Sequence, residues 1–101
     1  MKKAGKPIVL ALANGRPLGL SKVEPLCDAI VEMWQPGVPG GKPLAGVLSG
    51  RVNPSGKLSI TFPRSTGQIP IYYNQRKTAR PQSGKYQNIP STPLYEFGYG
   101  L

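Results

Sequence analysis

Residues 52–64 read V-N-P-S-G-K-L-S-I-T-F-P-R and carry the densest structural signal in this chain of 101 residues. Asn53 to Gly56 is a turn sequence, because proline presets φ, asparagine closes a turn through its side chain and glycine tolerates positive φ. Lys57 to Phe62 then alternates between polar and apolar residues, which predicts a strand with one buried face. That face would consist of Leu58, Ile60 and Phe62. The proline that follows ends the strand, because proline cannot donate to a ladder.

Upstream of this unit, the sequence predicts a buried strand and a short helix. Ile8 to Ala13 is a continuous apolar run, typical of a strand buried on both faces. Ser21 is the expected N-cap of a helix, with Glu24 completing a capping box. The helix must be short, because Pro25 is tolerated only in a first turn.

A second strand and a second helix are predicted before residue 52. Ala29 to Trp34 is apolar, contains a β-branched pair and runs into a Pro-Gly turn, all of which favour a strand. Lys42 to Ser49 carries leucine and valine at helical spacing, and Gly50 supplies a C-cap. The order is β-α-β-α-β once residues 57–62 are included. This order predicts an α/β fold with a mostly parallel sheet.

The composition changes after Arg64. The following residues are rich in proline, tyrosine, serine and glycine, which predicts an extended, loop-rich connector. We therefore expect a folded part over residues 1–64 and a connector over residues 65–101.

Charge and residue usage limit the possible functions. Thirteen Lys and Arg against four Asp and Glu give a net charge of +9, which suits a partner that is anionic. The basic residues are scattered, except for a cluster at Arg76, Lys77 and Arg80 beside several tyrosines, and no RNA-reading motif accompanies them. The chain has no histidine and one cysteine, Cys27, which excludes Ser-His-Asp and Cys-His catalysis, histidine metal sites and an intramolecular disulfide. We expect no metal and no cofactor.

The first residues do not make a convincing signal peptide. Met1 to Lys6 is basic, but the apolar run that follows is about six residues, shorter than the usual 7–15. We favour a strand there. No apolar segment is long enough to span a membrane, and the sequence leaves the localisation open.

Six motifs follow one another along the chain. They are N-G-R-P-L at 14–18, W-Q-P-G-V-P-G-G at 34–41, N-P-S-G-K-L-S-I-T-F-P at 53–63, G-Q-I-P-I-Y-Y-N at 67–74, A-R-P at 79–81 and P-L-Y-E-F-G-Y-G-L at 93–101. In this order and spacing they resemble the carboxy-terminal α/β-sandwich domain of glycoside hydrolase family 3, the β-glucosidase family.

The resemblance implies part of a three-layer α/β/α sandwich that ends where a fibronectin type III-like domain would follow. It also implies an amino-terminal barrel domain, or other remaining enzyme segments, as the natural partner. Members of the family release terminal β-linked sugars from non-reducing ends with retention, using two carboxylates about 5–5.5 Å apart. Full-length relatives are often periplasmic or secreted.

The resemblance places both catalytic carboxylates outside this chain. The family's nucleophile belongs to the barrel domain, and the acid/base residue, where it lies in the sandwich domain, precedes the N-G-R-P-L motif. The carboxylate side chains present are Glu24, Asp28, Glu32 and Glu96. None matches either catalytic position, so we assign no catalytic residue and expect a glycosidase fragment that is inactive alone. The alternative is a small basic interaction module that binds nucleic acid or an acidic partner.

Two residues are candidates for substrate binding. Arg16 follows the first predicted strand at its carboxyl end, where open α/β sheets bind ligands, although it would also suit a contact with a neighbouring domain. Trp34 would offer a stacking surface to a sugar, but a packed aromatic at a strand end is the favoured interpretation. Glu32 lies within an apolar run, so its carboxylate must find a partner or shift its pKa. A truncated sheet would also leave an unpaired edge and exposed apolar surface, which predicts self-association.

Overall fold

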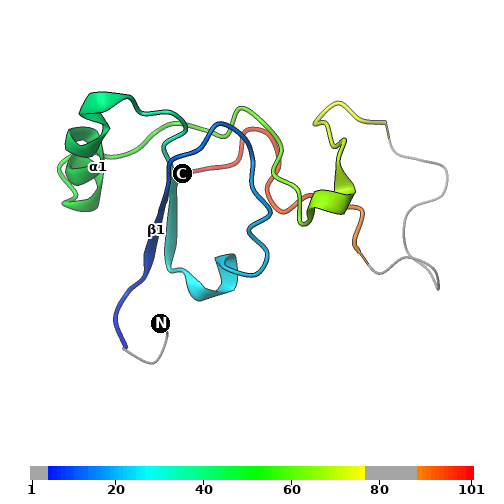
Figure 1. Cartoon of the computed structure of the whole chain (residues 1–101), viewed down its shortest axis with the longest axis horizontal. Coiled ribbons are helices and arrows are strands. Elements are labelled where there is room, and N and C mark those ends of the chain that lie inside the picture. Colours follow the sequence, from blue (N-terminus) through cyan, green and yellow to red (C-terminus); the bar gives the residue numbers. More distant parts are fainter. Residues whose placement is uncertain (1–4, 77–88) are drawn as a thin grey trace. The chain divides into compact units, whose positions relative to one another are not determined.

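The computed structural model describes residues 5–76 and 89–101. Figure 1 shows the course of the chain. The described residues group into two compact units. Unit 1 comprises residues 5–16, 22–56 and 101, and unit 2 comprises residues 17–21, 57–76 and 89–100. The division into residues 1–64 and 65–101 stays a prediction.

Unit 1 is built on two parallel strands. β1 (Val9–Leu12) pairs with β2 (Ala29–Glu32) in a register that places Val9 opposite Ala29 and Leu12 opposite Glu32. This confirms the two predicted strands and an α/β arrangement. The prediction that the first strand is buried on both faces is wrong for the described structure. Leu10 and Leu12 are half-buried, whereas Val9 on the alternate face is 45% exposed, because this small sheet is not covered on both sides.

The short helix before β2 forms as the 3₁₀ helix η2 (Glu24–Leu26), with Pro25 in its first turn. Its N-cap is Val23, and no side chain caps it. The predicted capping box at Ser21 is therefore wrong, because the helix begins three residues later and Glu24 opens it. Asp28 then links the two strands, since its Oδ2 accepts the backbone N–H of Ile8 at 2.7 Å.

The predicted second helix is confirmed as α1 (Gly41–Leu48), which follows the 3₁₀ helix η3 (Val38–Gly40). Gly50 adopts φ +72° just after the cap residue and donates its N–H to the carbonyl of Val47 at 3.0 Å. Arg51 donates to the carbonyl of Gly46 at 3.0 Å. These two bonds form a Schellman motif, which explains why the helix ends at a glycine.

The strand predicted over residues 57–62 is wrong. The backbone bends at Ser59 and Ile60, and only Phe62 forms a bridge, antiparallel to Tyr95. Phe62 donates to the carbonyl of Tyr95 at 2.9 Å, and a second pair of bonds joins Leu58 to residues 98–99 at 2.7 and 2.8 Å. Residues 58–62 therefore pair with residues 94–99 at two points, and not with a parallel sheet. The described sheet has two strands.

The bend also changes which side chains of this segment are buried. Phe62 is 2% exposed and Thr61 6%, whereas Ile60 is 43% exposed. The predicted buried face of Leu58, Ile60 and Phe62 is therefore wrong for Ile60, because a strand keeps its alternation only while its backbone stays extended. The Phe62 ring packs edge-on against Tyr95, with centroids 6.3 Å apart. In unit 2, Leu20 is also buried, at 3% exposure.

The segment after Arg64 is fastened to the segment that precedes residue 95. The 3₁₀ helix η4 (Thr66–Gln68) ends at Gln68, whose Nε2 donates to the carbonyls of Pro90 and Thr92 at 2.7 and 3.2 Å. The Nε of Arg64 donates to the same Thr92 carbonyl at 3.0 Å. Residues 90–92 are thus held by two side chains of the P-R-S-T-G-Q sequence.

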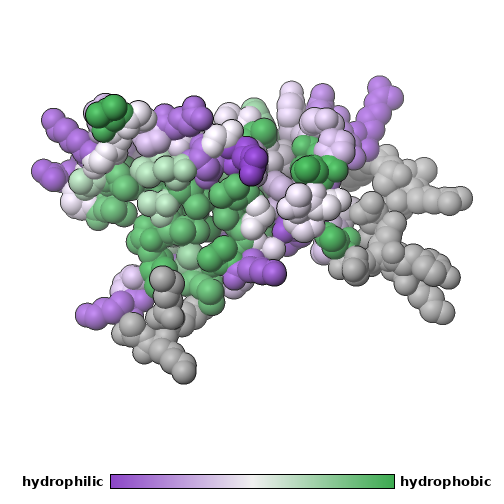
Figure 2. Space-filling model, in the orientation of Figure 1, coloured by the Kyte–Doolittle hydropathy of each residue, from purple (hydrophilic) through white to green (hydrophobic). Residues whose placement is uncertain are grey.

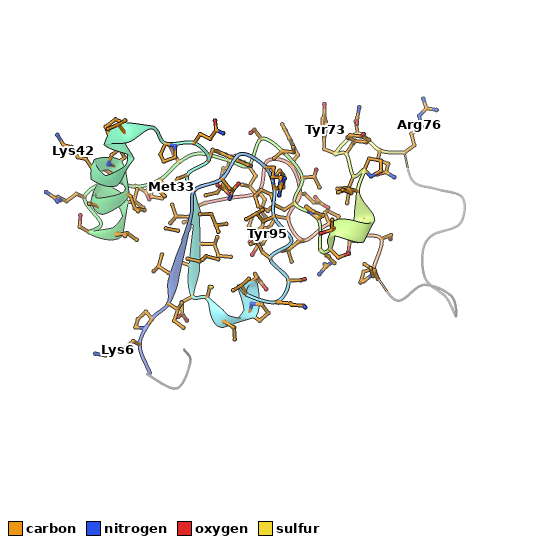
Figure 3. All side chains as sticks on the ribbon, in the orientation of Figure 1. Lys6, Met33, Lys42, Tyr73, Arg76 and Tyr95 are labelled. Carbon is orange, nitrogen blue, oxygen red and sulfur yellow. The ribbon has the colours of Figure 1, made fainter. Side chains whose placement is uncertain are left out.

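Several sequence-based interpretations lie outside the described residues. They concern the A-R-P motif at 79–81, the basic residues Lys77 and Arg80, and the basic start of the chain at Met1. Of the basic cluster, Arg76 is described, and it projects from the ribbon together with Tyr73 (Figure 3). Among the residues that the structure describes, no helix has the length and apolar character needed to cross a membrane.

Candidate functional site

Two neighbouring turns follow β1 and β2 and bring the predicted binding residues together. Because the strands are parallel, their carboxyl ends meet at one edge of the sheet. The pairing continues beyond the strands, since Met33 donates to the carbonyl of Leu12 and Asn14 donates to that of Trp34, both at 2.9 Å. We call the group Asn14, Arg16, Glu32 and Trp34 the carboxyl edge.

The first turn places Arg16 at this edge. The side-chain oxygen Oδ1 of Asn14 accepts the backbone N–H of Arg16 at 3.3 Å, an Asx turn that reverses the chain after β1. Gly15 lies between them, and a Cβ there would approach Nε2 of Gln35 to 3.0 Å. The flexible Gln35 side chain could move away from such a Cβ, and the Arg16 side chain is exposed beside the two turns.

The second turn depends on an unusual backbone conformation at Trp34. Its φ is +52°, a left-handed value that is rare for a bulky residue. The Trp34 N–H donates to Oε1 of Glu32 at 2.9 Å, and its carbonyl accepts the N–H of Asn14. The indole is half-buried. Half-burial is compatible with a packed aromatic and with a sugar platform, so both interpretations of Trp34 stay open.

Glu32 has the partners that its apolar surroundings require. Its Oε1 accepts from the Trp34 backbone, and its Oε2 accepts from the side-chain amide of Asn14 at 3.3 Å. These two bonds supply the partners that the sequence predicted for a carboxylate within an apolar run. The sequence analysis missed Asn14 as that partner. The signal was present in the Asn-Gly pair that follows β1, but only the strand register, with Leu12 opposite Glu32, brings the Asn14 side chain within reach of that carboxylate.

Asp28 and Glu32 are the two carboxylates that flank the second strand of the sheet. Asp28 precedes β2 and Glu32 ends it, so the rise of a strand separates them by about 13 Å, against about 5–5.5 Å for a retaining pair. Glu24 lies on η2, and Glu96 belongs to unit 2. Within residues 5–76 and 89–101, no group of three or more Cys, Asp or Glu side chains is arranged to hold a metal ion.

Unit 2 contains a groove of about 340 Å³ that the sequence analysis did not predict. Tyr72, Tyr73 and Phe97 line it together with polar residues that include Gln75 and Glu96. The rings of Tyr73 and Phe97 stack with centroids 4.7 Å apart. The aromatic residues of the motifs at 67–74 and 93–101 were the sequence signal for this groove, but only the folded chain brings them together.

Comparisons with known proteins identify the family. The family model described as "Glycosyl hydrolase family 3 C-terminal domain" matches residues 1–101. A periplasmic beta-glucosidase of Salmonella typhimurium is 50% identical over an alignment of 109 positions, which covers 100% of this chain and 14% of that protein. A beta-xylosidase of Formosa agariphila is 41% identical over an alignment of 100 positions, which covers 98% of this chain and 14% of that protein.

A solved structure agrees with these sequence relatives. The crystal structure of a beta-glucosidase from Listeria innocua in complex with isofagomine matches with a TM-score of 0.87 and 47% sequence identity. The match covers 99% of this chain and 15% of the other. The chain thus spans about one seventh of the length of these relatives. Because the family model matches residues 1–101, the chain belongs to glycosyl hydrolase family 3 and corresponds to a fragment of that family's C-terminal domain.

Proposed function

We propose that this chain is the part of a retaining β-glucosidase-type glycoside hydrolase that contributes substrate-binding side chains. The enzyme would hydrolyse terminal, non-reducing β-linked sugars. One observation carries the proposal: in a chain of this family, Arg16 and Trp34 come from two hydrogen-bonded turns at the carboxyl edge of a parallel sheet. An arginine supplies several hydrogen-bond donors for sugar hydroxyls, and an indole face suits the apolar face of a sugar ring.

The two-stranded sheet is proposed to be part of a larger three-layer α/β/α sandwich. Two observations support this. The relatives are about seven times longer than the chain, and Val9 on the second face of β1 is 45% exposed although its neighbours are apolar. A strand with this composition is typical of a sheet that helices cover on both sides. The amino-terminal barrel domain, or other remaining segments of such an enzyme, would be the partner.

The chain alone is proposed to be inactive, because Asp28 and Glu32 are too far apart to act as a retaining pair and the family's catalytic carboxylates match no position here. A basic module that binds nucleic acid was the alternative suggested by the net charge of +9. No contact within the described residues favours that alternative.

The test uses the free chain and a chimera. In the chimera, these 101 residues replace the matching segment of the Salmonella beta-glucosidase, with which they share 50% identity. We expect the free chain to release no more aryl alcohol from an aryl β-glucoside than buffer does, and the chimera to be active. In the chimera, Arg16→Ala should raise KM about tenfold, the effect of losing about 1.4 kcal/mol of binding through charged hydrogen bonds.

Lys22→Ala is the matched control, because Lys22 is an exposed cation of unit 1 outside the carboxyl edge. It should leave KM within about twofold, which is the effect of a surface charge of little consequence. Turnover by the free chain, or a folded Arg16→Ala chimera with unchanged kinetics, would contradict the proposal.

A further inference from the structure

We infer that Glu32 is the positioning residue of the carboxyl edge, and that its single carboxylate fixes both turns that carry Arg16 and Trp34. The inference rests on the proposed function for its meaning in sugar binding. Its test, however, needs no sugar and no catalysis.

Four hydrogen bonds form a closed set around this carboxylate. Glu32 Oε1 accepts the Trp34 N–H at 2.9 Å, and Glu32 Oε2 accepts from Asn14 Nδ2 at 3.3 Å. The Oδ1 of Asn14 accepts the N–H of Arg16 at 3.3 Å, and the N–H of Asn14 donates to the Trp34 carbonyl at 2.9 Å. Each turn is therefore tied to the other by a backbone bond and by a side-chain bond.

The conformation of Trp34 explains why such a set is needed. A φ of +52° places Cβ of a bulky residue close to its own backbone, and it persists only where surrounding contacts hold it. The contact with Glu32 closes a turn from residue 32 to residue 34 and favours the left-handed conformation. Because the direction of the Cα–Cβ bond follows the backbone, the same contact sets where the indole lies.

The hydrogen-bond inventory requires a carboxylate at this position, and not merely a polar side chain. Both oxygens of Glu32 act as acceptors, whereas a glutamine offers one acceptor and one donor. In Glu32→Gln, the new amide donor would face the amide donor of Asn14. If Asn14 turned its amide over to relieve this, its oxygen would no longer accept from Arg16. Glutamine therefore costs one bond in either arrangement.

This logic gives a rescue experiment. In Asn14→Asp alone, two carboxylates would stand where Asn14 Nδ2 and Glu32 Oε2 are now 3.3 Å apart, and they would repel each other. In the double variant Asn14→Asp with Glu32→Gln, the aspartate accepts from both the glutamine amide and the Arg16 N–H. Donors and acceptors match again, because residue 32 now donates the side-chain hydrogen bond and residue 14 accepts it.

Two measurements on the full chain report the outcome. The first is the hydrogen-exchange rate of the residue-14 backbone amide, which bonds to the Trp34 carbonyl. The second is the fluorescence emission of Trp34, the one tryptophan of the sequence. We expect exchange about fivefold faster in Glu32→Gln and at least tenfold faster in Asn14→Asp, with a red shift of the emission in both. The double variant should return to within about twofold of the parent chain.

Asp28→Asn is the matched control. Asp28 is also a carboxylate beside β2, but it lies before the strand and accepts the Ile8 N–H, which an asparagine oxygen can do equally well. It should leave both signals unchanged.

The measured exchange rates and emission spectra either support or contradict the role of Glu32. Single variants that lose structure while the double variant keeps it would support it as firmly as the graded result. It would be overturned if the residue-14 amide is unprotected in the parent chain, if neither single variant changes the two signals, or if the double variant is no better than Asn14→Asp. If the double variant recovers the parent exchange rate and emission but the chain binds no sugar, the proposed function is contradicted while this inference is supported.

Discussion

At the scale of single residues, Gly40 has the least room of the glycines in unit 1. Gly40 is buried and immediately precedes α1. A Cβ atom added at residue 40 would lie 2.5 Å from the Cβ and 2.9 Å from the Cγ of Pro36. The proline ring is rigid and cannot rotate away, so the backbone must move. We expect Gly40→Ala to lower the free energy of unfolding by about 2 kcal/mol, the usual cost of overpacking.

Urea denaturation of the chain measures this effect, and the next residue provides the control. Gly41 begins α1 with φ −65°, and a Cβ there would meet nothing within 4 Å. Gly41→Ala should be neutral or stabilise the chain by up to about 1 kcal/mol, because alanine favours the helix. Equal midpoints for the two variants would show that the contact with Pro36 does not limit residue 40.

At the scale of elements, Gln68 is the fastening point of unit 2. Its Oε1 accepts the backbone N–H of Arg64 at 2.6 Å while its Nε2 donates to two carbonyls, those of Pro90 and Thr92. Gln68→Glu keeps the shape but turns an oxygen toward the two carbonyls. We expect a loss of about 0.5–1.5 kcal/mol in local stability, the usual net contribution of a hydrogen bond, since Pro90 and Thr92 are exposed.

Amide exchange at Leu94 reads out this loss, because the Leu94 N–H donates to the Phe62 carbonyl at 2.9 Å just beyond the fastened segment. The rate should rise by about fivefold or more in Gln68→Glu. Gln75→Glu, a change of the same kind at an exposed position of unit 2, should not alter it. Identical Leu94 exchange in all three proteins would show that η4 does not hold residues 90–92.

Local patterns predicted β1, β2 and α1, because an apolar run and a helical cap act within a few residues. The strand prediction for residues 57–62 was wrong because their pairing partner, residues 94–99, lies more than thirty residues away in the sequence. The bend at Ser59 and Ile60 is also not visible in the alternation of polar and apolar residues. The strand-end rule singled out Arg16, and its aromatic ring singled out Trp34; a role of either residue in substrate binding stays a prediction. It could not find Asn14 as the partner of Glu32, since that contact depends on the register of two strands and on a left-handed residue.

At the scale of the whole molecule, the apolar surface of unit 1 predicts self-association of the chain. Figure 2 shows hydrophobic residues gathered around β1, and Val9, Val23 and Leu26 are each more than 40% exposed. Contiguous apolar surface of this kind marks an interface. Sedimentation velocity should therefore show species larger than a monomer, with the average size rising with concentration.

Two matched variants locate the contact. Val9→Lys places a charge on the exposed face of β1 and should shift the chain toward monomer. Val38→Lys changes a fully exposed valine of η3 and should not. A parent chain that sediments as a single monomer at all concentrations would contradict the prediction.

The pairing of Phe62 with Tyr95 also has a consequence for how the chain is made. The two residues are 33 positions apart. At the usual speed of about 5–20 residues per second, a ribosome adds Tyr95 about 2–7 s after Phe62. The strands and helix of unit 1 are complete by residue 48, so that unit can take shape early. Until Tyr95 has been added, the edge-on contact between the two rings cannot form, and this interval is when a chaperone that recognises apolar side chains would act on the segment around residue 62.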